Sequence, residues 1–550
     1  MSVSSRRFLP GLALSVLVAA CADQGPAPIT PGVDCSTSTP VNLNPGESVA
    51  LSATVNDGCI RIPAAGAGGA RHLIVAYSGS GSETQNGVFG PFAFSSQGVA
   101  LAATAVPGPQ FSSRPASNQA ARFHATLRDR EQELARDGSR RHQASSRVQR
   151  IPPVEGSQRT FKVCGDVTCA PGNFVDVPAT ALFVGPRGAI YLDNTVPSGG
   201  LTQEDIDSLG SLFDGASPNM YEIDTMAFGS PSDLDGNSVV VVLLTDAVND
   251  LSGNCSDGSI ILGYFFGLDL VTDPNSNNGE VFYGLVPDPN GPTCTASKEF
   301  VFDNLPPVLI HELQHMISFN QHVIIRDGAG EQTWLNEALS HFAEELGGRQ
   351  IPDARCPNFT SCLEQFGIGN LSNGFDYLSN PQTAFLVYPG SSFGSLEERG
   401  ASWLFLRWLL DHEAVDTLLG TDITRALVAT TQVGASNVAA VTGQAFDQLV
   451  GQWQMANFTE RLGGFVDGTG RLRYRSFNLV AEFSALGASY PLNPDSITAG
   501  AFASTGFLRG GSGKHVLVVQ GANDGAIDLQ LKGDNSFSSL VPRLAVVRIQ

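Results

Sequence analysis

The run HELQH, residues 311–315, combines two histidines and a glutamate at a spacing that suits metal chemistry. Residues four apart lie on one face of an α-helix, so His311 and His315 can bind the same ion. Glu312 lies between them on an adjacent face, where its carboxylate can accept a proton from a water molecule at that ion. The spacing therefore predicts a zinc site that activates water.

A catalytic zinc site needs a third protein ligand, and the sequence offers two candidates. One known pattern places a third histidine six residues after the second and a glycine before it. This chain has Gln321 and Ser318 at those two positions, and His322 is one residue out of register. The other candidate is Glu337, in the run WLNEALSHFAEELGG at residues 334–348, which predicts a second helix returning antiparallel to the first. We favour Glu337, because its carboxylate completes a site of two histidines and one glutamate.

Local signals mark the ends of both predicted helices. Asp303 or Asn304 is expected to cap the first helix, with the Pro-Pro pair at 306–307 in its first turn. Thr333 is expected to cap the second helix, and the Gly-Gly pair at 347–348 to end it.

The segments HELQHMISFN, NEALSHFAEE and GASWLFLRWL together resemble the gluzincin zinc metallopeptidases, and most of all the hyicolysin family of secreted bacterial enzymes. The resemblance covers roughly residues 160–460. The chain departs from thermolysin-like enzymes in having His341, not aspartate, four residues after Glu337. It also lacks the Gly-x-Met-Glu-Asn motif of the aminopeptidases in that clan, which counts against an exopeptidase.

This resemblance implies an α+β zincin-like metallopeptidase domain with a mainly helical C-terminal lobe. It also implies that His311, His315 and Glu337 bind zinc, that Glu312 is the general base and that the substrates are polypeptides. Hydrolysis needs a further donor for the developing oxyanion, and Tyr388, His341 and Arg399 are the candidates. His341, four residues after Glu337, is also a candidate for a supporting role behind the metal ligands, with a purely structural buried histidine as the alternative.

Two other features bear on the site. The buried run at 239–244 predicts a strand, and we expect a peptide substrate to lie along it. The turn Asp233-Leu234-Asp235-Gly236-Asn237 carries alternating oxygen ligands. Asp233, Asp235 and Asn237 are therefore a candidate calcium site, with a plain polar hairpin turn as the alternative.

The N-terminus predicts export. Arg6 and Arg7 precede a 13-residue apolar stretch, too short to span a bilayer, which ends in Ala19-Ala20-Cys21. The ending resembles a bacterial lipobox, which implies cleavage before Cys21, acylation of that cysteine and anchoring in the cell envelope. The alternative is an ordinary secretory signal peptide and a secreted protein.

The remaining eight cysteines suit an oxidising compartment. Pairing sequence neighbours keeps each bridge within one predicted domain. The predicted disulfides are Cys35–Cys59, Cys164–Cys169, Cys255–Cys294 and Cys356–Cys362.

Composition shifts divide the 550 residues into segments. Short β-type runs near both ends predict small β-sandwich domains flanking the metallopeptidase domain. The segment from 121 to 150 holds eight Arg and four acids, in a chain of net charge −21, and predicts a polar helix within a linker or propeptide. The predicted segments are a signal peptide (1–20), a tether (21–34), a β-domain (35–105), an Arg-rich linker or propeptide (106–158), the metallopeptidase domain (159–480) and a second β-domain (481–550).

The net charge of −21 argues against nucleic acid as a partner. Two hypotheses remain from the sequence. One is an exported zinc endopeptidase anchored to the membrane by lipid at Cys21, and the other is a surface-anchored binding lipoprotein with a non-catalytic peptidase-like domain. The sequence leaves the oligomeric state open.

Overall fold

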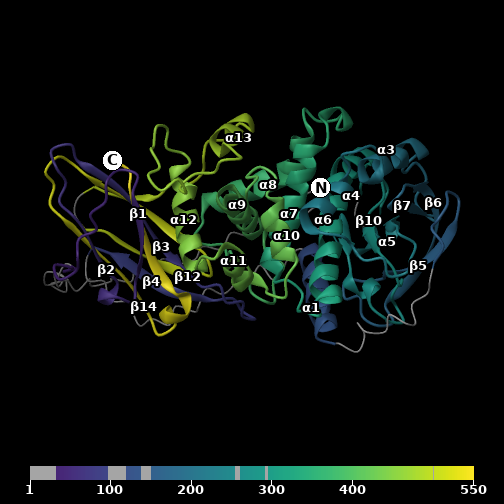
Figure 1. The fold of residues 1–550 in the computed structure, drawn as a ribbon, viewed down its shortest axis with the longest axis horizontal. Coiled ribbons are helices and arrows are strands. Elements are labelled where there is room, and N and C mark those ends of the chain that lie inside the picture. The colour runs from purple at the N-terminus through teal and green to yellow at the C-terminus, as the bar shows by residue number, and fades with distance from the viewer. Residues whose placement is uncertain (1–32, 97–118, 138–149, 254–259, 292–294, 499–500) are drawn as a thin grey trace, which may run out of the picture.

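The computed structural model describes residues 33–96, 119–137, 150–253, 260–291, 295–498 and 501–550. A β-sandwich lies at one end, a six-stranded sheet with its helices at the other, and a group of helices between them (Figure 1). Cys21 and the Cys255–Cys294 pair lie outside the described residues. Among the described residues, no helix combines the length and the apolar character needed to cross a bilayer.

The six-stranded sheet has the order β5-β6-β7-β8-β10-β9. β8 pairs in parallel with β7 and β10, whereas β9 pairs with β10 antiparallel and forms one edge. The predicted strand at 239–244 is β8, but it lies inside the sheet, so its expected role as a substrate-binding edge is wrong. The strands are β5 (Gln158–Cys164), β6 (Phe174–Val184), β7 (Gly188–Asp193), β8 (Val240–Leu244), β9 (Gly263–Phe265) and β10 (Val281–Gly284).

The long helix α6 (Lys298–Phe319) packs beside this sheet, and a second long helix, α7 (Thr333–Gln350), packs against α6. α6 begins earlier than predicted, because the side chain of Ser297 accepts the amide of Phe300, and Pro306 and Pro307 lie inside the helix. A proline at 307 cannot donate to the carbonyl of Asp303. That carbonyl accepts a hydrogen bond from the Gln365 side chain at 3.1 Å, which removes part of the cost.

The glycine pair at 347–348 does not end α7, contrary to expectation, and the helix starts after Gln332 with no side-chain cap. A β-carbon on Gly348 would lie 2.8 Å from the Cα of Leu363, and one on Gly347 would lie 2.9 Å from the Phe366 ring. These glycines therefore permit close packing against the next helix, α8 (Cys362–Ser379).

Further helices complete this half of the chain. Three lie near the sheet, α3 (Gln203–Asp214), α4 (Met220–Phe228) and α5 (Asp246–Leu251). The remaining ones are α9 (Leu396–Glu413), α10 (Thr421–Val428), α11 (Gly434–Thr442), α12 (Phe446–Thr459) and α13 (Leu479–Ala485). All four tryptophans of the chain are buried in this helical region, which is consistent with the predicted helical lobe. A π-helical turn (Asn320–Ile325) continues α6.

The two predicted β-domains form one sandwich, which corrects the predicted division of the chain. β3 lies between β13 and β15, and β4 lies between β12 and β14, so strands from both ends alternate within each sheet. Strand patterns in a sequence reveal strands but not their partners. The first sheet has the order β1 (Ser48–Ser52), β15 (Pro542–Arg548), β3 (Ala70–Ser78), β13 (Gly513–Gln520) and β11 (Asp495–Ile497). The second has the order β12 (Ala503–Arg509), β4 (Phe89–Ser95), β14 (Ile527–Gly533) and β2 (Cys59–Ile62).

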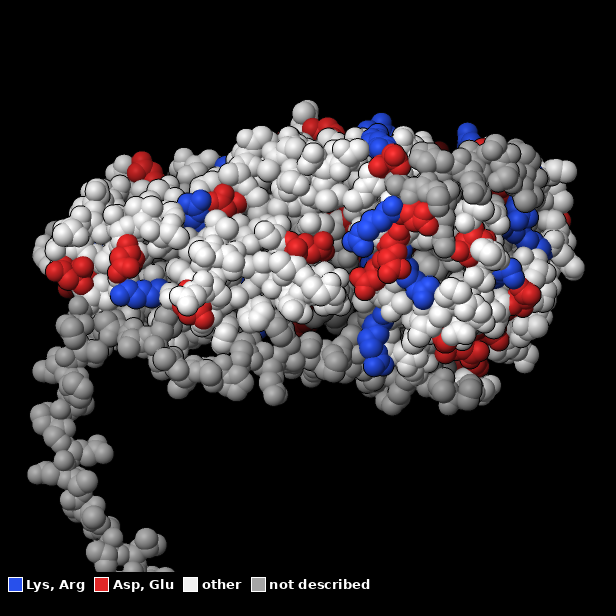
Figure 2. Space-filling model, turned by 90° about the horizontal axis from the view of Figure 1, so that it is seen from below, with Lys and Arg blue, Asp and Glu red and all other residues white. Residues whose placement is uncertain are grey.

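Part of the predicted linker is an ordered helix, α1 (Gln119–Arg136), which lies beside α6 (Figure 1). Figure 2 shows acidic and basic side chains intermixed over the half of the molecule that contains α1 and the six-stranded sheet. The described residues on this face form no broad patch of a single sign.

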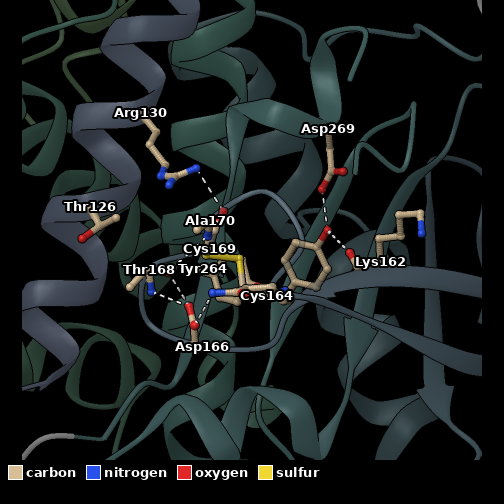
Figure 3. The surroundings of a disulfide bond; sticks show 12 residues. Thr126, Arg130, Lys162, Cys164, Asp166, Thr168, Cys169, Ala170, Tyr264 and Asp269 are labelled. Atoms are coloured by element: carbon tan, nitrogen blue, oxygen red, sulfur yellow. Dashed lines mark hydrogen bonds between the residues drawn. A yellow bond between two sulfur atoms is a disulfide. The ribbon is translucent and has the colours of Figure 1, made fainter. Parts of the chain in front are cut away.

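Three of the four predicted disulfides are confirmed: Cys35–Cys59, Cys164–Cys169 and Cys356–Cys362. Figure 3 shows the second of them. Arg130 of α1 donates to the carbonyl of Cys169 at 3.0 Å, which ties the helix to this loop.

Candidate metal centre

Three side chains from α6 and α7 converge as predicted, and we call them the histidine cluster: His311, His315 and Glu337. The Nε2 atoms of the two histidines lie 3.1 Å apart. Nε2 of His315 is 3.3 Å from Oε1 of Glu337, and Nε2 of His311 is 3.7 Å from Oε2. His322, the rejected alternative, is buried elsewhere, with its Nε2 3.8 Å from Glu331.

The side-chain atoms of the histidine cluster suit a zinc ion. Glu337 is fully buried, yet neither carboxylate oxygen has a hydrogen-bond partner in the described structure. Burying an ionised carboxylate without hydrogen bonds is very costly unless a cation balances it. Two imidazole nitrogens and one carboxylate are also the donor set of catalytic zinc sites.

α7 orients both imidazoles from behind. Nδ1 of His311 lies 2.7 Å from Oε1 of Glu344, and Nδ1 of His315 lies 3.1 Å from Oγ of Ser340. The Ser340 hydroxyl donates to the side chain of Gln314 at 2.6 Å, so it can accept from His315. A proton on Nδ1 of each histidine satisfies these contacts and leaves Nε2 free to bind a metal.

Sequence reasoning missed Ser340 and Glu344. They lie three and seven residues after Glu337, a helical spacing that places all three side chains on one face of α7. Burial opposes ionisation of Glu344, but His341 and His311 outweigh it and lower the pKa of this carboxyl to about 2. Glu344 is therefore the anionic partner that holds His311.

The proposed general base, Glu312, lies at the edge of the six-stranded sheet. Its Oε2 accepts a hydrogen bond from the backbone amide of Phe265 at 2.7 Å, and the side chain is 4% exposed. Burial raises the pKa of Glu312, although His311 and Arg128 partly counter that shift. A raised pKa suits a group that accepts a proton and then donates it.

The three candidate oxyanion donors have different surroundings. His341 lies 3.1 Å from Glu344 and so supports the metal ligands indirectly. Tyr388 is buried with its hydroxyl 2.9 Å from Ser402. Arg399 stacks over Phe393 at 4.0 Å, and its charge is among the causes that lower the pKa of Glu337.

A second group of carboxylates, which we call the acidic cluster, contains Asp233, Asp235 and Glu280, with one oxygen from each within 4.8 Å of the others. Asn237 lies beside it: its Nδ2 donates to Asp235 and its Oδ1 accepts the amide of Val239. Oε1 of Glu280 accepts two hydrogen bonds, whereas Oε2 is buried without a partner.

Beside His315 the structure leaves a cavity of only about 10 Å³, room for about one water molecule. Its walls come from α1, α6, α7 and the loop before α7. They are Arg128, Glu131, Gln132, His315, Ser318, Phe319, Gly330, Glu331 and Asn336.

Comparison with known proteins adds little to this geometry. No family model matches the chain, and no curated protein matches it in sequence. It is similar in structure to a mutant M1 zinc metallopeptidase from Deinococcus radiodurans bound to a Tyr-Ser-Ala substrate. The two share 15% identity and a TM-score of 0.28, over 54% of this chain and 51% of that one. A mutant two-domain M1 zinc metallopeptidase bound to L-tryptophan gives a TM-score of 0.27 at 15% identity, with the same coverage of 54% and 51%. The chain thus spans about half the length of the solved structures that it matches, at a similarity too low to assign a function.

Proposed function

We propose that this protein is an exported zinc endopeptidase, in which His311, His315 and Glu337 bind the metal and Glu312 is the general base. The observation that carries the proposal is the buried Glu337 carboxylate, which faces two bare imidazole nitrogens and has no hydrogen-bond donor. The resemblance of the two motifs to gluzincins, and of the whole to the hyicolysin family, supports the same assignment.

When bound there, Zn²⁺ would supply a Lewis acid that polarises a carbonyl group and makes water a better nucleophile. The protein supplies the proton transfer. Glu312 accepts the proton of the attacking water and passes it to the leaving amine. Glu344 and Ser340 keep His311 and His315 in the required orientation throughout. Tyr388 and Arg399 are the remaining candidates for contact with the developing oxyanion.

The edge strand β9 explains how a polypeptide would lie beside Glu312. The amide and carbonyl of Phe265 and the amide of Gly267 bond to side chains and not to another strand. An extended peptide can add to such an edge through main-chain hydrogen bonds. Because Glu312 bonds to the amide of Phe265, a peptide on β9 would lie next to the general base.

The test is the Glu312→Gln variant, which keeps shape and removes only the base. We expect it to fold and bind zinc but to lose hydrolysis of casein, while 1,10-phenanthroline inhibits the unchanged protein. Full activity of Glu312→Gln would overturn the mechanism. Zinc binding without hydrolysis in any form would favour the rival, a binding lipoprotein with a non-catalytic domain.

Export and lipid attachment remain proposals from the sequence. The N-terminal signal and the lipobox-like ending at Cys21 support them, and the disulfides suit an oxidising compartment. Labelling of cells with a fatty acid should mark the protein, and Cys21→Ser should abolish the label. A secreted, unlabelled protein would identify an ordinary signal peptide.

We also propose calcium as a second metal, at the acidic cluster, where Glu280 joins Asp233 and Asp235 of the set predicted from sequence. The unpartnered Oε2 of Glu280, in a side chain only 2% exposed, supports it. Calcium should raise the melting temperature of the unchanged protein and not that of Glu280→Gln. An equal response of the two proteins would overturn this assignment.

A further inference from the structure

α1 is amphipathic, and its inner face is buried against the lobe that carries the histidine cluster. The buried side chains on this face are Phe123, Leu127, Arg128, Glu131 and Leu134. The outer face exposes Arg122, Asp129, Glu133 and Arg136. The helix comes from the Arg-rich segment and supplies none of the three residues of the histidine cluster.

Two side chains of α1 bond to the backbone of the β9 edge. Arg128 donates to the carbonyl of Phe265 at 3.0 Å, and Glu131 accepts the amide of Gly267 at 2.8 Å. Arg128 and Glu131 also pair with each other at 2.9 Å, and both are almost fully buried. The Phe265 carbonyl lies on the edge strand and the Gly267 amide just after its end, and an extended peptide can use such main-chain groups at a sheet edge. The helix therefore satisfies the groups that the proposed function assigns to a substrate.

α1 also reaches both walls of the space around the metal site. On the sheet side, the Phe123 ring packs edge-on against Tyr264 with centroids 4.9 Å apart. On the helical side, His124 stacks on Phe393 at 4.8 Å, and Gln132 donates to the carbonyls of Gly330 and Glu331. The cavity beside His315, into which Arg128 and Glu131 of α1 face, has a volume of about 10 Å³. A peptide backbone cannot enter a space of that size.

We propose that α1 is an autoinhibitory helix that fills the substrate groove, so that the folded chain is a latent enzyme activated by displacement or removal of α1. The inference rests on the proposed function for the identity of the groove, but the covering of the metal site can be measured independently of hydrolysis. Two rates are therefore followed: cleavage of a quenched peptide, and withdrawal of zinc from the loaded protein by 1,10-phenanthroline.

The opening variant is Phe123→Asp in the full-length, zinc-loaded protein. A carboxylate in place of the buried ring weakens docking of α1. We expect both rates to rise roughly tenfold or more, because each rate is proportional to the fraction of molecules in which α1 is undocked. The matched control is Arg122→Asp, which puts the same side chain on the exposed face of α1 and should leave both rates unchanged.

The closing variant is Gln119→Cys with Gly253→Cys. A β-carbon built on Gly253 lies 3.4 Å from the β-carbon of Gln119, close to the separation found in disulfides. Oxidation should fix the start of α1 and reduce both rates below those of the unchanged protein. A mild reductant should restore them, with the unchanged protein in the same reductant as the control.

The outcomes separate the two proposals. Opposite shifts of both rates in the opening and closing variants support the autoinhibitory helix and the peptidase together. Opposite shifts of zinc withdrawal without any peptide cleavage support the covering helix and overturn the peptidase. If Phe123→Asp reduces cleavage and neither variant changes zinc withdrawal, α1 is a structural part of the active fold and the autoinhibitory helix is overturned.

Discussion

The histidine cluster and the acidic cluster differ in what balances their negative charge. In the histidine cluster, the Glu337 carboxylate receives no hydrogen bond and faces only two imidazoles. In the acidic cluster, Arg150 lies 3.4 Å from Asp235, and backbone or hydroxyl donors serve Glu280 and Asp233. The first cluster therefore leaves a carboxylate that a bound cation would balance, whereas the second is largely satisfied by the protein itself.

The pKa directions follow the same contrast. Burial opposes ionisation of Glu337, but the two histidines overcome it and hold the pKa of this carboxyl well below its ordinary value. Burial raises the pKa of Glu280, and the hydrogen bonds from Ser232 and Leu234 do not fully compensate. A metal should matter much more at the histidine cluster than at the acidic one.

The largest expected effect is the loss of zinc in Glu337→Ala. Without the only carboxylate of the histidine cluster, zinc content should fall from about one ion per chain to almost none, with loss of hydrolysis. Metal analysis of the purified protein measures it. Glu299→Ala, an exposed glutamate at the start of α6, is the control and should keep its zinc. Retention of zinc by Glu337→Ala would place the metal elsewhere.

The second largest expected effect is the loss of stability when zinc is removed from the unchanged protein. Free zinc at about 100 times its dissociation constant stabilises the folded state by roughly 2.7 kcal/mol. Calorimetry before and after chelation should show a clear fall in melting temperature, larger than the fall on removal of calcium. Equal falls for the two metals would contradict the contrast between the clusters.

A smaller effect is expected from the residues behind the ligands. Glu344→Gln and Ser340→Ala should each weaken zinc affinity about 10–100-fold, because each loses the partner that orients one imidazole. Competition with a chromophoric chelator gives the affinities. Ser379→Ala, an exposed hydroxyl on α8, should bind zinc normally. Unchanged affinity in both variants would show that α7 does not orient the histidines.

The smallest expected effect is the pH dependence of the stability that Glu280 contributes. Because its folded-state pKa is raised above 4.5, Glu280 adds stability at low pH that is lost as the pH rises through the folded-state pKa. The free energy of unfolding can be measured by urea denaturation in calcium-free buffer between about pH 4 and about pH 8. As the pH rises, that of Glu280→Gln should increase relative to that of the unchanged protein. If the free energies of unfolding of the two proteins change with pH in parallel, burial does not raise the pKa of Glu280.

Prediction from sequence was correct for contacts between residues that lie close together in the chain. The four-residue spacing of His311 and His315 and the helical run around Glu337 led to three side chains that do converge. Three disulfides between sequence neighbours were also predictable, because short loops close easily. The same reasoning failed for the helix ends, since Ser297 starts α6 and the glycine pair at 347–348 serves packing.

The sequence by itself determined the HELQH motif, its pairing with Glu337 and the presence of most strands and helices, because these depend on spacing along one or two elements. Only the tertiary structure decided that strands from the two ends share one sandwich, that Glu280 lies beside Asp233 and Asp235 and that α1 lies over β9. The reason is physical: such contacts join residues far apart in the chain through backbone pairing and burial. Neither backbone pairing between distant strands nor burial of one helix against another produces a periodic pattern that identifies the partner.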